Sequence, residues 1–348
     1  MLLTTPLVSA LRQRWPAVHI AVLGFAGTLA LLQGNDEIDE RIEVRRGDDL
    51  AAKWRLLRRL WRRYDLALVT QAGDRPALYG WIAARRRASV APEAGTGHGA
   101  WWKRRLAQHR VVADRNRHTV LEKLLLVEPW IDLETQPVSV HPPAAAPLPE
   151  ALAQALSPGY LVVHAPSMWQ YKQWPVAHFR SLVAALLADG RQVVLTGSSA
   201  PRDQQIIAQL RDLGSAPQLL DASQGISLAQ VATLLAGARA YVGPDTSVTH
   251  LAASLGTPLV ALFGPTRPTA WGPWPQPHPA RGPWALRGPE PLRVQRVGKV
   301  ILMQGPSRPG DDCVPCGRAG CDDHRDSRSE CLERLSPQQV LEQLATLT

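Results

Sequence analysis

The chain of 348 residues lacks the features of a membrane-spanning or secreted protein. It has no run of about eighteen uncharged apolar residues, so we expect no spanning helix. Residues Met1–Pro6 have no basic region before their apolar side chains and do not resemble a secretion signal. Cysteine is absent before Cys313. A composition of 45% hydrophobic and 20% charged residues is ordinary for a folded protein and argues against extensive disorder, and the length favours two domains.

Acidic residues are scarce in one part of the chain. Residues 51–125 contain 17 Lys and Arg against 5 Asp and Glu, a local excess of 12 that exceeds the net charge of +9 of the whole chain. The cationic clusters are Arg58-Arg59, Arg62-Arg63, Arg85-Arg86-Arg87 and Lys103-Arg104-Arg105. Such a field attracts nucleic acid, an anionic membrane surface or a phosphorylated glycolipid, whereas solvated helix faces are the alternative explanation. The tryptophans here follow no recognised nucleic-acid-binding motif, so we expect no nucleic-acid partner.

Buried strands and amphipathic helices alternate in both halves of the chain. In the first half we expect helices over 6–15, 27–33 and 50–64 and strands over 18–25, 38–44 and 66–70; the pattern weakens beyond Gly73. In the second half we expect strands over 161–164, 192–196, 218–220, 240–243 and 259–263, with the last closing the series, and helices over 176–188, 201–213, 228–235 and 248–255. This rhythm predicts an α/β fold of two facing doubly wound domains with parallel sheets and a ligand crevice at the carboxyl ends of the strands.

The Pro- and Ala-rich segment after Glu134 has no charge and predicts an extended linker. The expected organisation is therefore an N-terminal domain over residues 1–134, a linker over 135–150, a second domain over 151–335 and a C-terminal helix over 336–348. Ser336 is the expected N-cap of that helix.

One segment combines a strand, an Asp-Thr turn, a helix and a second strand. It runs from Val242 through Asp245-Thr246-Ser247 and His250 to Gly264-Pro265-Thr266. Hydroxyl and small residues at a strand-to-helix junction are typical of phosphate-binding sites. His250 lies four residues beyond Thr246 and so shares its helical face. The alternative for Asp245 is a purely structural role as the N-cap of the helix.

A second loop, His164–Pro175, follows the first strand of the second half. It contains Ser167 and the sequence Lys172-Gln-Trp-Pro. A fixed ammonium group can stabilise the negative charge that develops on a phosphate leaving group. The alternative is a surface lysine beside packing tryptophans. Gly197-Ser198-Ser199 and Gly264-Pro265-Thr266 lie in further loops of the same crevice, although turn chemistry explains them nearly as well.

Together these segments resemble glycosyltransferase family 9, the heptosyltransferases of lipopolysaccharide core synthesis. The matching pattern is Asp-Thr, His-Leu-Ala-Ala, Leu-Gly-Thr-Pro and Leu-Phe-Gly-Pro-Thr, within residues 242–266. The resemblance implies a GT-B fold and the inverting transfer of heptose from ADP-heptose to the inner core, without a catalytic metal. It also implies a lipopolysaccharide acceptor held by the N-terminal domain and a nucleotide sugar held by the domain over 151–335. The implied location is cytoplasmic, peripheral to the inner face of the membrane.

The resemblance also implies roles for individual residues. Asp245 would accept hydrogen bonds from heptose hydroxyls, and Thr246 and Ser247 would offer backbone N–H groups to the diphosphate. Ser167 and Lys172 would bind the same diphosphate, with Lys172 stabilising the leaving group. His250 would be a supporting polar contact.

The element Leu2-Leu3-Thr4-Thr5-Pro6 resembles the latter part of the family's first structural unit. In the family a strand and a Gly-Asp loop precede it, and that Asp is the proposed general base. No residue of this sequence occupies the position, so we assign no catalytic base. The expectation is either a longer native protein or an impaired enzyme, and a catalytically impaired sugar-nucleotide-binding or assembly protein of the same fold is the alternative function.

The four cysteines, Cys313, Cys316, Cys321 and Cys331, lie within nineteen positions, with His324 among them. A CxxC pair and two further thiols predict a structural four-thiolate zinc site, whereas reduced thiols or disulfides are the alternatives. Some members of the family carry a similar cluster, so it fits the resemblance.

Overall fold

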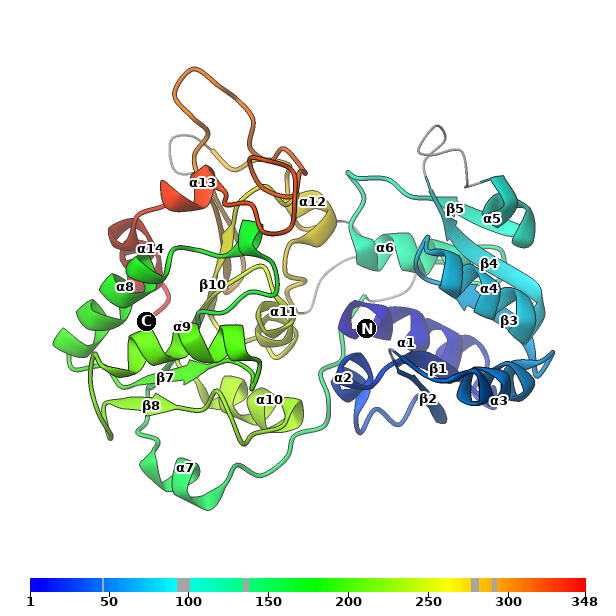
Figure 1. Ribbon diagram of the computed structural model, residues 1–348, viewed down its shortest axis with the longest axis horizontal. Coiled ribbons are helices and arrows are strands. Elements are labelled where there is room, and N and C mark those ends of the chain that lie inside the picture. Colours follow the sequence, from blue (N-terminus) through cyan, green and yellow to red (C-terminus); the bar gives the residue numbers. More distant parts are fainter. Residues whose placement is uncertain (46, 93–100, 134–137, 277–281, 290–292) are drawn as a thin grey trace. The chain divides into compact units, whose positions relative to one another are not determined.

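The computed structural model describes residues 1–45, 47–92, 101–133, 138–276, 282–289 and 293–348. The chain divides into two compact units, the first made mainly of residues 1–141 and the second mainly of residues 142–348 (Figure 1). This division lies within the predicted linker, of which residues 135–137 are outside the described ranges, as is residue 134. Residues 142–149 belong to the second unit, where the backbone of Ala146 both donates to and accepts from Thr233 Oγ1, at 3.2 Å and 2.7 Å.

Two small parallel sheets make up the described strands of the first unit. One pairs β1 (Ala21–Phe25) with β2 (Glu40–Val44). The other has the order β3 (Tyr64–Val69), β4 (Ala84–Ala91) and β5 (His109–Val112). Around them lie η1 (Leu2–Thr4), α1 (Thr5–Arg14), α2 (Ala26–Leu29), η2 (Ala30–Leu32), α3 (Leu50–Leu60), α4 (Asp74–Ala83), α5 (Trp101–Leu106), α6 (Thr119–Leu124) and η3 (Leu125–Val127).

The elements predicted before Gly73 are present, with shifted ends. The prediction that the first strand is buried is wrong, because β1 is only half-buried and Phe25 is exposed. Helix α3 begins where expected, since the side chain of Asp49 caps it by accepting from Ala52 N at 2.6 Å. It ends before the predicted Tyr64, and two residues beyond its last residue Arg62 has a left-handed φ of 50° that is incompatible with helix.

The second unit contains a seven-stranded sheet with the order β11-β12-β10-β9-β6-β7-β8. The strands are β6 (Leu161–His164), β7 (Val193–Thr196), β8 (Leu219–Asp221), β9 (Ala240–Pro244), β10 (Leu259–Phe263), β11 (Val294–Val297) and β12 (Val300–Gln304). All pairings are parallel except β11 with β12, which confirms the predicted parallel sheet. The prediction that residues 259–263 close the series is wrong. The chain returns after a Pro-rich segment, and the buried strand β12 pairs with β10.

Helices cover both faces of this sheet (Figure 1). The helices described in the second unit are α7 (Glu150–Ala155), η4 (Gln170–Lys172), α8 (Val176–Ala188), α9 (Pro201–Arg211), α10 (Leu228–Gly237), α11 (Ser247–Ser254), α12 (Pro268–Trp271), α13 (Glu330–Glu333) and α14 (Pro337–Ala345). Alternate strand residues such as Val163 and Val242 form one apolar core with α8, α9 and α14. Tyr241 points to the opposite face, where its hydroxyl lies 2.8 Å from Thr249 Oγ1 of α11.

The C-terminal helix α14 confirms the predicted cap. Ser336 is its N-cap and accepts from Gln339 N, while the side chain of Gln339 accepts from Ser336 N, completing a capping box. The cap fixes the start of a helix that packs on the sheet core.

Trp174 connects this core to the loop before α8, and its replacement tests that connection. The ring is fully buried, packs edge-on against Phe179 at 4.7 Å, and donates from Nε1 to Leu335 O at 2.9 Å. We expect Trp174→Ala to lower the free energy of unfolding by about 3–5 kcal/mol, because it leaves a cavity and an unpaired carbonyl. Denaturant unfolding followed by circular dichroism measures the change. The matched control is Trp54→Ala, whose ring is 66% exposed and whose loss we expect to cost little; equal effects of the two variants would contradict the packing described.

Candidate functional site

The loops that follow β6 and β9 lie together at the carboxyl edge of the sheet. The two strands are parallel neighbours, so their ends bring the two loops to the same place. Lys172 Nζ lies 2.6 Å from Asp245 Oδ2, and His250 Nε2 lies 3.8 Å from Asp245 Oδ1. Three of the residues singled out in the sequence are therefore one cluster, drawn from segments more than seventy positions apart.

Asp245 lies between β9 and α11 and is 7% exposed. The N-cap of α11 is Thr246, which makes no side-chain capping hydrogen bond within the described chain, so the alternative of Asp245 as the N-cap is wrong. Thr246 Oγ1 lies 3.4 Å from Thr249 Oγ1 instead. The Asp245 carboxylate thus contacts Lys172, and the first amides of α11, at Ser247 and beyond, have no side-chain cap from Thr246.

The Lys172 ammonium group is largely buried, with 20% of its side chain exposed. Burial lowers the pKa of Lys172, but the charge of Asp245 and the hydrogen bond to it outweigh burial, so the net effect is a raised pKa. The ring of Tyr171 lies 5.9 Å from Nζ and adds a cation–π contact. Lys172 is consequently a charged, positioned ammonium at neutral pH. The alternative of a surface lysine is wrong.

The loop that presents Lys172 is held by a buried amide that the sequence analysis missed. Gln173 Oε1 accepts from Ser167 N at 2.9 Å, and Gln173 Nε2 donates to Ala165 O and Trp174 O, both at 2.8 Å. Ser167 is 3% exposed and lies in the loop after β6, which ends at His164. A single Gln between a Lys and a Trp carries no sequence signal for such a role, since only the folded loop brings its three partners together.

The remaining loops of this edge have clear structural roles. Ser198 donates to Asp203 Oδ2 at 2.6 Å in the first turn of α9. Gly264 is required by packing, because a Cβ there would lie 2.8 Å from Leu332 Cγ. His164 Nδ1 lies 3.1 Å from Thr196 Oγ1, and burial lowers the pKa of His164 to about 4, so the ring is neutral. Ser198, Gly264 and His164, the last residue of β6, therefore each have a contact within the second unit.

The segment that carries the cysteines packs on two loops of the second unit, one after β6 and one after β10. Ser329 Oγ donates to Tyr171 O at 2.6 Å, and Gln170 N donates to Arg325 O at 3.1 Å. Gly317 N donates to Pro265 O at 2.8 Å. The position of Lys172 therefore depends on residues near the C-terminus as well as on its own loop.

The cysteines themselves differ in burial. Cys331 is buried and burial raises its thiol pKa to about 12, whereas Cys313 and Cys321 are exposed and Cys316 is half-buried. Across the described ranges, no group of three or more His, Cys, Asp or Glu side chains is placed to hold a metal ion. The four-thiolate zinc site stays a prediction from the sequence. It requires one zinc per chain in a metal analysis of the purified protein, and a zinc content near zero would exclude it.

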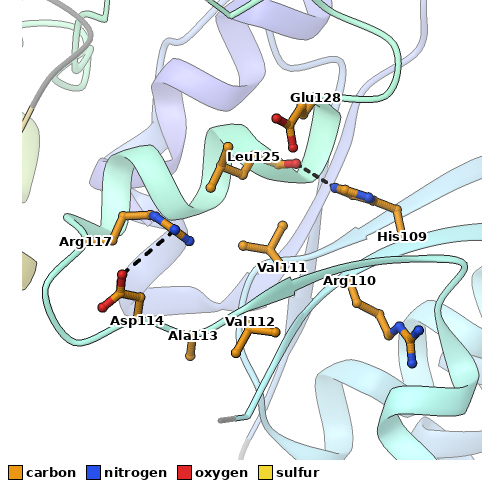
Figure 2. A pocket seen from close by; sticks show the side chains of 9 residues that line it. All are labelled: His109, Arg110, Val111, Val112, Ala113, Asp114, Arg117, Leu125 and Glu128. Atoms are coloured by element: carbon orange, nitrogen blue, oxygen red, sulfur yellow. Dashed lines mark hydrogen bonds and ion pairs between the residues drawn. The ribbon is translucent and has the colours of Figure 1, made fainter. Parts of the chain in front are cut away.

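A separate hollow of about 440 Å³ lies in the first unit, beside β5. Figure 2 shows two interactions among the residues that line it: Arg117 faces Asp114 at 3.8 Å, and His109 Nε2 lies 2.8 Å from Leu125 O. Arg110 contacts Arg104 O at 3.4 Å. The hollow mixes both signs of charge and does not define a ligand, so the cluster of Lys172, Asp245 and His250 is the stronger candidate.

A double-mutant cycle tests the ion pair. We expect Lys172→Met and Asp245→Asn each to destabilise the protein by a few kcal/mol, because each leaves a buried partner uncompensated. The double variant should be less destabilised than the sum, with a coupling of about 0.5–3 kcal/mol. Since the pKa of Lys172 is raised above the ordinary 10.5, this coupling is present below pH 10.5 and lost as pH rises through the folded-state pKa. Thermal unfolding at pH 7 and pH 11 measures both effects; strict additivity at pH 7 would argue against the pair.

The sequence is similar to a known protein family and to individual members of it. The model of "Glycosyltransferase family 9 (heptosyltransferase)" matches residues 53–280. Lipopolysaccharide heptosyltransferase 3 of Escherichia coli is 25% identical over 288 residues, which cover 79% of this chain and 83% of the relative. Lipopolysaccharide heptosyltransferase 1 of Pseudomonas aeruginosa is 32% identical over 214 residues, or 57% of this chain and 51% of the relative.

Solved structures agree at the level of the fold. E. coli ADP-heptose lipopolysaccharide heptosyltransferase II superposes with a TM-score of 0.70 at 21% identity, covering 100% of this chain and 94% of that one. The E. coli heptosyltransferase WaaC with ADP gives a TM-score of 0.68 at 18% identity, covering 100% and 96%. The predicted GT-B type fold is confirmed. The chain belongs to glycosyltransferase family 9, the heptosyltransferase family, and is a glycosyltransferase.

Proposed function

We propose that this glycosyltransferase moves heptose from ADP-heptose to the inner core of lipopolysaccharide, with inversion at the anomeric carbon. The observation that carries the proposal is the contact between Lys172 and Asp245 at the ends of two adjacent parallel strands. This edge of an open α/β sheet is where phosphate-containing ligands bind. The similarity to lipopolysaccharide heptosyltransferases supplies the sugar and the acceptor, and similar solved structures are described with ADP and with a fluorinated ADP-heptose.

On the donor side, Lys172 stabilises the departing diphosphate. As the bond from the anomeric carbon to the phosphate oxygen breaks, negative charge grows on ADP, and a positioned ammonium lowers the energy of that state more than the ground state. Asp245 keeps the ammonium charged and oriented, and its second oxygen faces His250. We assign the heptose hydroxyls to Asp245, with His250 as a supporting contact.

The diphosphate itself is assigned to backbone and hydroxyl donors. The amino end of α11, at Thr246 and Ser247, offers N–H groups in a positive helix dipole. Ser167 lies in the loop after β6, which Gln173 holds in place. These donors come from the same two loops as the ion pair.

The acceptor hydroxyl attacks the anomeric carbon from the side opposite to ADP and gives up its proton as the new glycosidic bond forms. We assign no residue of this chain as the general base, and the proposal includes no catalytic metal. The acceptor is assigned to the first unit, whose Arg and Lys clusters suit carboxylate and phosphate groups.

Matched substitutions test the donor site. We expect Lys172→Ala and Asp245→Asn to lower kcat/KM for transfer from ADP-heptose to a defined core acceptor by about 10²–10³, as expected for the loss of one charge-stabilising group. The controls are Lys299→Ala and Asp212→Asn, which remove an exposed lysine and an exposed aspartate of the same unit.

Calorimetric titration with ADP-heptose, alongside the transfer assay, separates the possible functions. Unchanged transfer by both site variants would remove their proposed roles. Donor binding by the unaltered chain with no transfer to any core acceptor would favour the alternative, a sugar-nucleotide-binding or assembly protein of the same fold.

A further inference from the structure

Helices α3, α4 and α5 of the first unit expose an unusual number of large apolar side chains. Three of the most exposed are Leu50 (75%), Trp54 (66%) and Trp61 (60%), on α3 and directly after it. The exposed large side chains of the other two helices are Leu78, Trp81 and Trp101. Single exposed apolar residues are ordinary, but a group of six on neighbouring helices marks an interaction surface.

The three helices are neighbours in the first unit. Helix α3 contacts α4, and α4 contacts α5. Lys103 Nζ of α5 lies 2.8 Å from Asp74 Oδ1 at the start of α4. The Arg62 guanidinium lies 5.6 Å from the ring of Trp61 and 5.7 Å from the ring of Trp81, which connects the end of α3 to α4. We refer to the exposed side chains of α3–α5 and the residues directly after α3 as the tryptophan–arginine surface.

Cationic groups are interspersed with these rings. On α3 the exposed cations are Lys53, Arg55, Arg58 and Arg59. Arg105 lies 5.3 Å from the ring of Trp101. Some of the charge is compensated: Arg59 and Arg63 both contact Glu40, and Asp74 is engaged by Lys103. The sequence surplus of cations over residues 51–125 nevertheless leaves this region strongly positive.

Apolar and cationic groups on one surface have a specific chemical complement. Tryptophan rings prefer the interface between lipid headgroups and acyl chains, and arginine binds the phosphates at the same depth. A nucleic acid would satisfy the cations but would leave Leu50 and Leu78 in water. None of the described helices is long and apolar enough to cross a membrane, so contact with lipid would be confined to the bilayer surface.

We propose that the tryptophan–arginine surface is the face through which this protein lies on an anionic phospholipid bilayer. The inference deepens the proposed function, because it rests on an acceptor that is itself embedded in a membrane. Leu50, Trp54 and Trp61 insert at headgroup depth, and Arg55 and Arg58 bind lipid phosphates. The acceptor would then be encountered at the surface on which the enzyme is already held.

Vesicle sedimentation of the full chain tests the surface. The vesicles contain phosphatidylethanolamine and phosphatidylglycerol, with pure phosphatidylcholine vesicles for comparison. We expect Trp54→Ser with Trp61→Ser, and separately Arg55→Gln with Arg58→Gln, to reduce partitioning onto the anionic vesicles by about tenfold or more. The matched controls, Trp271→Ser and Arg296→Gln with Lys299→Gln, replace exposed residues of the other unit and should partition as the unaltered protein does. Surface variants that partition like the controls, or equal binding to both kinds of vesicle, would overturn the proposal.

Two further measurements keep this proposal distinct from the proposed function. The tryptophan variants should transfer heptose normally to a deacylated, soluble core oligosaccharide, while transfer to lipopolysaccharide in vesicles falls. Failure of the unaltered protein on both acceptors, with vesicle binding intact, would count against the transferase function and not against the surface. Tight binding to a DNA duplex that needs the arginines but not the tryptophans would show that the surface serves nucleic acid instead, and would overturn the membrane assignment.

Discussion

The ion pair between Lys172 and Asp245 depends on one constraint, the parallel pairing of β6 with β9 in a sheet that is buried on both faces. Parallel strands must end at the same edge, so the loops that leave them meet there. The ion pair is largely buried beside these apolar strands and has little contact with water. A buried ammonium group is costly unless a carboxylate compensates its charge. A charged group held in this way can stabilise a second anion without a rearrangement of the surrounding protein.

Support for the pair comes from distant parts of the chain. Gln173 fixes the loop from within, Trp174 connects it to Leu335, and Ser329 bonds to Tyr171 O beside Lys172. The last forty residues therefore do more than cover the sheet with α14. They fix the geometry of a loop whose own sequence is too short to form a core, and a change there would reach Lys172 through these hydrogen bonds.

Much of the fold was predictable because buried parallel strands are short continuous apolar runs. Strands β6, β7, β9 and β10 and the capping box at Ser336 follow that rule or the rules of helix caps. Strand β4 was not predicted, because it includes Arg85-Arg86-Arg87 and these charged residues interrupt the apolar run expected of a buried strand. Strand β12 was not predicted, because a Pro-rich segment separates it in the sequence from β10, the strand with which it pairs. Pairing between distant segments leaves no local pattern, so neither the order of the strands nor the antiparallel edge at β11 could be read from the residues alone.

The candidate site was likewise predictable from the sequence only in part. The sequence by itself determined which residue types stand at the strand ends, Lys172 and Asp245 among them, because turn and strand propensities are local and the family motif is contiguous. Only the tertiary structure decided that the two side chains touch, that Thr246 and not Asp245 is the helix cap, and that Gln173 braces the loop. It also decided that the exposed tryptophans of residues 54–101 lie on or beside three helices that contact one another in sequence order. Distances between residues far apart in the chain are set by packing, and packing is a property of the whole fold.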